Sequence, residues 1–325
     1  MIIILIKGRN LLPSQANSVG SAVGTGTPAL LVIVQGLTPG ALLMAMAESN
    51  PAPIAPLLNG VPETMLWPLY NRAFAASQSN PILHDPLSIE LTERIDYDFE
   101  ARFGKASIMH AIRARRCDEL VTDYLRLETR KPTVVALGEG LDSQLWRLGD
   151  APLQWISVDV PEAIALRDQL LPPDPRVQHI ACSAMDFSWM DHVPATSRPF
   201  ISASGLLMYF SNADVAALLE AIAARFPDAQ LFFDTIPPGF SRRTMQGMQL
   251  TQHYTTPPMP WGITIGDIPR FLRSVQGLLP VSVQTYADPY PQYTKFYKAL
   301  SLIPPLRNRL APALVHARVV DPHTA

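Results

Sequence analysis

Cysteine and net charge are both scarce in this chain. Cys117 and Cys182 are its only two cysteines in 325 residues, which excludes a disulfide scaffold and a zinc site built on cysteine pairs. Lys and Arg number 26 against 28 Asp and Glu, a net charge of −2, so the strong positive field of a general nucleic-acid binder is lacking. We therefore expect a reduced, cytoplasmic protein with no bound metal and no nucleic-acid partner.

Charge is rarest in the first 47 residues. Lys7 and Arg9 are the only charged residues before Glu48. A secretory signal has a basic start before its apolar core, whereas Met1–Ile6 is apolar at once. A membrane span over Ala29–Ala47 would contain glutamine, glycine and proline and would barely reach the necessary length. We expect residues 1–47 to be a disordered or misassigned leader, and we expect no membrane contact.

Apolar residues and proline are plentiful. Hydrophobic residues make up 48% of the chain, which is typical of a packed globular protein. Proline occurs 32 times, about twice the average frequency of roughly 5%. Because clustered prolines break helices and strands, they predict loops between elements.

The chain from residue 48 to 130 has a helical pattern. Apolar residues at helical spacing predict a helix over Thr64–Ala76, and a second over Leu87–Ile95 after an Asp-Pro pair. A long third helix is expected to begin after a cap at Ser107 and to run to Leu127. We expect residues 48–130 to form an N-terminal helical cap.

The remainder, residues 131–325, alternates short apolar runs with helical segments. The predicted strands are Thr133–Leu137, Gln154–Val158, Val177–Cys182, Phe200–Ser204 and Ala229–Phe233, with further strands over Leu279–Tyr286 and Ala313–Val320. The predicted helices are Ser143–Leu148, Pro161–Leu171, Asn212–Arg225 and one near Asp267–Val275. This alternation predicts the α/β class, a doubly wound and mostly parallel sheet of Rossmann-like type.

Two glycines and an acid follow the first two strands. Gly138 and Gly140 allow the backbone to approach a ligand closely. Asp159 lies 19 residues beyond Gly140 at the end of the next strand, where a carboxylate can accept hydrogen bonds from ribose hydroxyls. The arrangement favours a nucleotide cofactor over a purely structural tight turn.

The type of nucleotide depends on the third position of the loop. A dinucleotide site has glycine or alanine three residues after the second glycine, beneath a pyrophosphate, and here that residue is Ser143. S-adenosylmethionine has no phosphate to accommodate. A nicotinamide oxidoreductase stays the alternative to a methyltransferase.

Two arginines fall on the apolar face of the long helix. Arg113 and Arg116 are four residues from apolar neighbours on either side, so both are expected to point inward. A buried guanidinium needs an anion. That anion is either a structural partner, such as Asp142 or a helix carbonyl, or the carboxylate at the methionyl end of the cofactor.

Several segments together resemble the leucine carboxyl methyltransferase family, which includes O-methyltransferases of polyketide biosynthesis. They are HAIRARRCDELV around Ala111–Asp118, VALGEGLDSQLWRL over Val135–Leu148, VDVP over Val158–Pro161, Asp186, GLLMYF over Gly205–Phe210, and Phe226–Asp234. The resemblance covers roughly residues 62–240. It implies a class I methyltransferase fold, S-adenosyl-L-methionine as cofactor, and methyl transfer to a carboxylate or phenolic oxygen of a small metabolite, polyketide-like in some relatives.

The resemblance also implies cofactor-binding residues. Position by position, these are Arg113, Gly138, Gly140, Asp159, Ser183, Asp186 and Ser204, with Arg72 as a further basic residue. The family has an acid at the positions of Ser183 and Ser204, and Asp186 is able to replace the first of these. Glu139 is also unusual, because its carboxylate would repel that of the cofactor unless Arg113 or Arg116 intervened. These departures leave a degenerate, non-catalytic member of the fold as a further alternative.

The acceptor side is less defined. A carboxylate acceptor is ionised at pH 7 and needs no base, whereas a phenol gains from a positioned histidine. Tyr209, near the fourth strand, is the predicted catalytic residue because it faces the expected methyl site. His253 is the histidine nominated as a base, within the Pro- and Thr-rich segment Thr235–Trp261. That segment is expected to form either an apolar lid, through Met245, Met248, Tyr254 and Trp261, or ordinary packing. The sequence predicts no oligomeric state.

Overall fold

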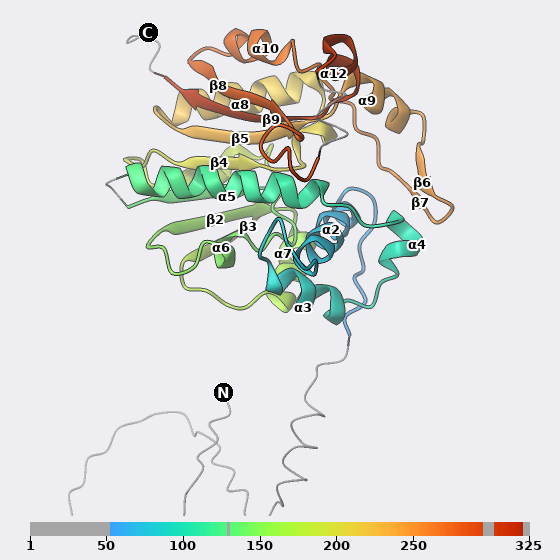
Figure 1. The fold of residues 1–325 in the computed structure, drawn as a ribbon. Coiled ribbons are helices and arrows are strands. Elements are labelled where there is room, and N and C mark those ends of the chain that lie inside the picture. Colours follow the sequence, from blue (N-terminus) through green and yellow to red (C-terminus); the bar gives the residue numbers. More distant parts are fainter. Residues whose placement is uncertain (1–52, 129–130, 295–301, 321–325) are drawn as a thin grey trace, which may run out of the picture. The chain divides into compact units, whose positions relative to one another are not determined.

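The computed structural model describes residues 53–128, 131–294 and 302–320. Its helices pack around a central seven-stranded sheet (Figure 1). Its strands are β1 (Thr133–Leu137), β2 (Gln154–Asp159), β3 (Val177–Ala181), β4 (Phe200–Ala203), β5 (Gln230–Thr235), β8 (Leu278–Thr285) and β9 (Ala313–Val319). Their order is β3-β2-β1-β4-β5-β9-β8. Strands β1 to β5 are parallel, and β9 is antiparallel to both of its neighbours. The predicted doubly wound, mostly parallel sheet is confirmed.

Helices cover both faces of the sheet, as Figure 1 shows for α5 (Met109–Leu127) along one of them. On that face, Val134 and Ala136 of β1 share a core cluster with Ile112 and Val121 of α5. The alternate residues of β1 belong to a second cluster on the other face, together with apolar residues of α8 (Asn212–Arg225). Because strand side chains alternate between faces, a strand covered on both sides buries every residue, as all five β1 residues are buried.

A third core cluster joins the N-terminal helices to the sheet domain. These helices are η1 (Pro62–Met65), α2 (Leu66–Ala76), α3 (Pro86–Arg94) and α4 (Phe99–Phe103). Leu66 and Leu69 of α2 pack with Leu141 and with apolar residues of α7 (Pro161–Leu170). The cluster therefore places the N-terminal helices beside the segment that follows β1.

The other elements are short. They are α6 (Gln144–Arg147), α9 (Pro238–Met245), α10 (Ile268–Ser274), α12 (Pro304–Leu310), η2 (Phe187–His192), η3 (Leu207–Tyr209) and the hairpin of β6 (Gln249–Thr251) and β7 (Tyr254–Thr255). No helix within the described part of the chain has both the length and the apolarity to cross a membrane. The predicted leader, residues 1–47, lies outside the described residues. Pro51–Ala325 forms one compact unit, and the predicted boundary at residue 130 stays a prediction.

One helix start differs from the prediction. The expected cap of α5 was Ser107, but Ile108 occupies the N-cap position and makes no side-chain cap bond. The Ser107 backbone N–H instead donates to Asn71 Oδ1 at 2.9 Å. Ser107 therefore faces α2, because its hydrogen bonds join two helices.

Candidate active site

A cavity of about 580 Å³ opens at the carboxyl ends of the central strands, beside the point where the strand order reverses between β1 and β4. This is the position at which open α/β sheets bind ligands. The predicted site residues that line it are Arg113, Gly138, Gly140, Asp159, Ser183, Ser204 and Tyr209. The three residues on which the sequence interpretation depended, Gly138, Asp159 and Arg113, thus surround one cavity.

The loop after β1 requires glycine at two positions. Gly138 and Gly140 have φ angles of +61° and +55°, a region that other residues rarely adopt. A Cβ on Gly138 would lie 2.7 Å from a side-chain carbon of Leu206, and one on Gly140 would lie 2.7 Å from Cβ of Met65. The loop is therefore held against two other segments that also line the cavity.

Asp159 is fixed by the same loop. Its Oδ2 accepts a hydrogen bond from the Gly140 backbone N–H at 2.7 Å, and its Oδ1 accepts one from Val160 at 2.8 Å. Burial raises the pKa of Asp159, while these two N–H groups and the nearby Arg167 oppose the rise. Each carboxylate oxygen keeps a lone pair, so Asp159 is able to accept hydrogen bonds from a diol in the cavity.

Arg113 is buried and paired with an acid at the end of β5. Its Nη1 lies 3.0 Å from Asp234 Oδ2. Asp234 also accepts hydrogen bonds from the Gly205 backbone N–H and, at 2.7 Å, from the Tyr286 hydroxyl. The prediction that the structural partner of Arg113 would be Asp142 or a helix carbonyl was wrong. The sequence placed Asp234 at a strand end but gave no sign that Arg113, 121 residues away, was its partner.

Arg116 is partly buried but does not line the cavity with Arg113. Its Nη1 lies 3.3 Å from Glu119 Oε2 on the same helix, and its side chain is 22% exposed. An i,i+3 ion pair at the edge of the helix satisfies its charge. Arg113 is therefore the guanidinium that α5 presents to the cavity.

Glu139 lines the cavity and has a cationic partner within the chain. Its side chain is 3% exposed and lies 3.0 Å from Nη2 of Arg167 on α7, and it accepts a hydrogen bond from Trp155 Nε1 at 3.2 Å. Arg167 also donates to the carbonyls of Gly140 and Asp142. The cation beside Glu139 is thus neither of the two that we expected, and it also holds the glycine loop in place.

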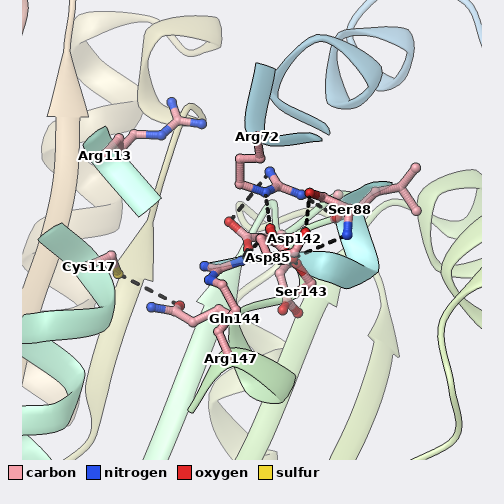
Figure 2. A network of polar contacts seen from close by, with 12 residues as sticks. Arg72, Asp85, Ser88, Arg113, Cys117, Asp142, Ser143, Gln144 and Arg147 are labelled. Atoms are coloured by element: carbon pink, nitrogen blue, oxygen red, sulfur yellow. Dashed lines mark hydrogen bonds and ion pairs between the residues drawn. The ribbon is translucent and has the colours of Figure 1, made fainter. Parts of the chain in front are cut away.

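Beneath the loop, two arginines and three aspartates form a buried network (Figure 2). Arg72 Nε lies 3.1 Å from Asp85, and Arg147 lies within 3.2 Å of Asp85, Asp142 and Asp118. Burial raises the pKa of Asp142, but Arg72 and Arg147 outweigh it and hold that pKa well below its ordinary value. The network ties α2, α3, α5 and α6 to the loop that lines the cavity.

Asp186 lies outside the cavity lining. Its side chain accepts a hydrogen bond from the Ser188 backbone N–H at 3.1 Å, at the start of η2, and the residue is exposed. Ser183, three residues earlier, lines the cavity. The role of Asp186 in cofactor binding stays a prediction.

Apolar and aromatic side chains also line the cavity. They include Trp67, Met109, Tyr209, Phe210, Phe240 and Met259, and the lining also has the polar residues Asn71, Ser107 and His110. Burial raises the pKa of Tyr209, so its hydroxyl stays protonated at neutral pH. His110 was not among the residues predicted from the sequence, although it precedes Arg113 by three residues and so shares its helix face.

The segment Thr235–Trp261 contributes less than a full lid. Tyr254 and Trp261 are 4% and 2% exposed within core clusters, and Met245 is 54% exposed. His253, the nominated base, is an exposed hairpin residue that does not line the cavity. The packing interpretation holds for the two aromatic residues, and the segment reaches the cavity through Ile236, Phe240 and Met259 instead.

Gly205 offers a test of how Arg113 is placed. A Cβ at Gly205 would lie 2.7 Å from Arg113 Nη1, and the φ of Gly205 is +74°. We expect Gly205→Ala to displace the guanidinium and to weaken binding of S-adenosylhomocysteine at least tenfold in calorimetry. Gly247→Ala is the matched control, because its φ is +76° with no atom within 4 Å. Equal affinity in the two variants would contradict the placement.

The chain is similar to known methyltransferases in sequence. A family model described as leucine carboxyl methyltransferase matches residues 66–223. The tetracenomycin polyketide synthesis O-methyltransferase TcmP of Streptomyces glaucescens is 35% identical over 226 residues, which are 68% of this chain and 81% of that protein. The S-adenosyl-L-methionine-dependent methyltransferase dpfgK of Gibberella zeae is 30% identical over 191 residues, 53% of this chain and 63% of that protein.

A solved structure from Thermobifida fusca, described as that of a proposed methyltransferase, has the same fold. Its TM-score is 0.50 at 16% identity, over 79% of this chain and 95% of that chain. The family and the cofactor predicted from the motifs are both confirmed. The chain belongs to the leucine carboxyl methyltransferase family of S-adenosyl-L-methionine-dependent methyltransferases.

Proposed function

We propose that this protein transfers a methyl group from S-adenosyl-L-methionine to a carboxylate or phenolic oxygen of a small aromatic metabolite. The observation that carries the proposal is that one cavity is lined both by charged side chains, Arg113 and Asp159, and by aromatic side chains, Trp67 and Phe240. A cofactor with two charged ends and an apolar acceptor fit such a mixed lining. TcmP, by its name, acts in polyketide synthesis, and we extend that substrate class to this chain.

The charged side chains of the cavity would bind the cofactor through hydrogen bonds. Asp159 would accept hydrogen bonds from the ribose hydroxyls, and Arg113 would donate to the carboxylate of the methionyl end. Arg113 has five N–H donors, of which Asp234 accepts from one and the Tyr286 hydroxyl lies in hydrogen-bond contact with the guanidinium, so donors remain for a ligand. Arg72 also lines this region and would add positive charge.

The apolar and aromatic side chains of the cavity would bind and orient the acceptor. When bound, the cofactor supplies an electrophilic methyl group on its sulfonium. Transfer of a methyl group is an in-line displacement that depends on holding the acceptor oxygen about 3 Å from the reacting carbon. Tyr209, whose hydroxyl stays protonated, would donate a hydrogen bond to the acceptor and fix that distance.

Family membership weighs against the nicotinamide oxidoreductase. A degenerate, non-catalytic member stays the second candidate, because Ser183 and Ser204 stand where the family has acids. Both serines line the cavity. Loss of one charged hydrogen bond costs about 1.5–3 kcal/mol, roughly ten- to a hundredfold in affinity, so the serines would weaken cofactor binding without abolishing it. Ser204→Glu is therefore expected to tighten it.

Transfer of a radiolabelled methyl group tests the proposal and identifies the acceptor atom. The full chain is incubated with methyl-labelled cofactor and matched aromatic acids and phenols, including anthraquinone-2-carboxylate and 2-hydroxyanthraquinone. Methyl esters release volatile methanol in mild base, whereas aryl methyl ethers do not. We expect labelled product with at least one acceptor class. Tight cofactor binding without transfer to any member would favour the non-catalytic candidate.

A further inference from the structure

Asn71 is held in one amide orientation. Its Oδ1 accepts a hydrogen bond from the Ser107 backbone N–H at 2.9 Å. A backbone N–H is only a donor, so the amide oxygen must face it and the amide nitrogen must lie on the other side. That nitrogen lies 2.7 Å from Nδ1 of His110.

This orientation sets the proton position on His110. Because the Asn71 amide nitrogen is a donor, Nδ1 of His110 must accept, and the neutral ring then carries its proton on Nε2. A protonated ring would place an N–H group against the amide NH₂. Rotating the Asn71 amide would relieve that conflict only by opposing its NH₂ to the Ser107 N–H.

The surroundings disfavour a charged ring as well. Burial and the guanidinium groups of Arg113 on α5 and Arg72 on α2 all lower the pKa of His110 well below its ordinary value. Trp67 packs edge-on at 5.5 Å between ring centroids, and Asn71 completes the α2 side. No acid approaches the ring closely among the described residues, so nothing there favours the imidazolium.

The Nε2 atom is available to a ligand. His110 lines the cavity, and within residues 53–128, 131–294 and 302–320 no hydrogen bond reaches its Nε2. That atom is also not among the buried nitrogens left without a partner. The ring therefore exposes an N–H donor to the cavity.

We infer that His110 is an acceptor-orienting residue: its Nε2–H, fixed by Asn71 and Ser107, donates a hydrogen bond to the acceptor oxygen and does not act as a general base. This rests on the proposed methyl transfer. A nitrogen that already carries its proton cannot remove one from a phenol, but it binds an oxygen that arrives ionised. The site thereby selects for acceptors that have no proton to lose.

The proton position can be measured without substrate. Nitrogen-15 correlation spectra of the histidine rings in the free protein, assigned with His110→Gln, are expected to show Nε2 protonated and Nδ1 unprotonated from pH 5.5 to 8.5. In Asn71→Asp we expect the opposite tautomer of the neutral His110 ring, with Nδ1 protonated and Nε2 unprotonated. The reason is that a carboxylate accepts hydrogen bonds from both the Ser107 backbone N–H and the His110 Nδ1–H. A wild-type ring protonated on Nδ1, or one that titrates near pH 6.5, would overturn the inference.

The donor role is tested with benzoate as a carboxylate probe in the presence of S-adenosylhomocysteine. His110→Gln keeps an amide N–H near the position of Nε2, and we expect benzoate affinity within about threefold of wild type. His110→Phe keeps the shape without the donor and should bind at least tenfold more weakly. His253→Gln, on the exposed hairpin, is the control. Equal affinity in the Gln and Phe variants, or no benzoate binding to wild type at 50 mM, would overturn the orienting role.

The Asn71→Asp variant adds a pH dependence that a merely structural role would not produce. The carboxylate introduced in this variant raises the pKa of His110 relative to wild type. Below that pKa the imidazolium donates from Nε2, whereas above it the neutral ring presents a lone pair there. Benzoate affinity should therefore fall as pH rises in this variant and stay level in wild type. The cofactor titration is separate: if S-adenosylhomocysteine fails to bind while the ring keeps its Nε2 proton, the proposed function fails and the proton assignment stands.

Discussion

Asp85→Ala is expected to lower the free energy of unfolding by about 3–5 kcal/mol, the cost of removing one partner from a buried ion pair. Asp85 is fully buried and lies 3.1 Å from Arg72 and 3.2 Å from Arg147. It also accepts hydrogen bonds from the Ser143 hydroxyl at 2.7 Å and the Ser88 backbone N–H at 3.2 Å. Alanine would leave two guanidinium groups and two further donors with fewer partners.

Urea unfolding followed by tryptophan fluorescence measures this change. The control is Asp123→Ala, which removes an acid from an ion pair with Arg126 whose side chains are 61% and 72% exposed. Exposed pairs contribute about 0.2–1 kcal/mol, so the control should lose no more than that. Similar losses in the two variants would show that the Asp85 network does not hold α2 and α3 to the sheet domain.

Removal of the charged side chain of either Asp159 or Arg113 should weaken cofactor binding at least tenfold. Asp159→Ala deletes the acceptor for the ribose hydroxyls and also the partner of the Gly140 and Val160 backbone N–H groups. Arg113→Ala deletes the donor for the methionyl carboxylate and leaves Asp234 with two donors in place of three. Each lost hydrogen bond to a charged group costs about 1.5–3 kcal/mol.

Calorimetric titration with S-adenosylhomocysteine checks both variants. Arg115→Ala is the control for Arg113, because Arg115 is on the same helix but its side chain is 37% exposed and stacks on Tyr290 at 4.4 Å. Asp168→Ala, an exposed acid on α7, is the control for Asp159. Unchanged affinity in both test variants would overturn the site assignment.

The sheet was predictable because its determinants are local. All five β1 residues are buried, and that run of five apolar or small residues was visible in the sequence. The observed β2 and β5 ended within two residues of the predicted ends, and the helix Asn212–Arg225 had the predicted bounds. The Gly-Glu-Gly loop and Asp159 were also predictable, since the loop directly follows β1 and Asp159 lies at the carboxyl end of β2.

The buried ion pairs were not predictable in the same way. Arg113 and Asp234 are 121 residues apart, and nothing local marks them as partners. The pairing of Glu139 with Arg167 likewise depends on how α7 packs beside the loop. For such residues the sequence predicts that a buried charge needs a partner, but the fold decides which one it meets.

Short irregular elements were missed for another reason. Helix α9 begins at Pro238 directly after Pro237, in a segment whose prolines predicted a loop. Proline is tolerated in the first turn of a helix, because the missing N–H has no partner there. The same composition therefore suits a loop and a helix start, and only the packing of Ser241 and Thr244 against the following segment distinguishes them.

Native mass spectrometry of the purified full chain with S-adenosylhomocysteine tests whether the cavity beside β1 and β2 binds the cofactor. We expect one bound molecule per chain, no binding of NAD at the same concentration, and loss of the bound species in Asp159→Ala. Failure of wild type to retain S-adenosylhomocysteine at millimolar concentration, or retention of NAD in its place, would contradict this expectation.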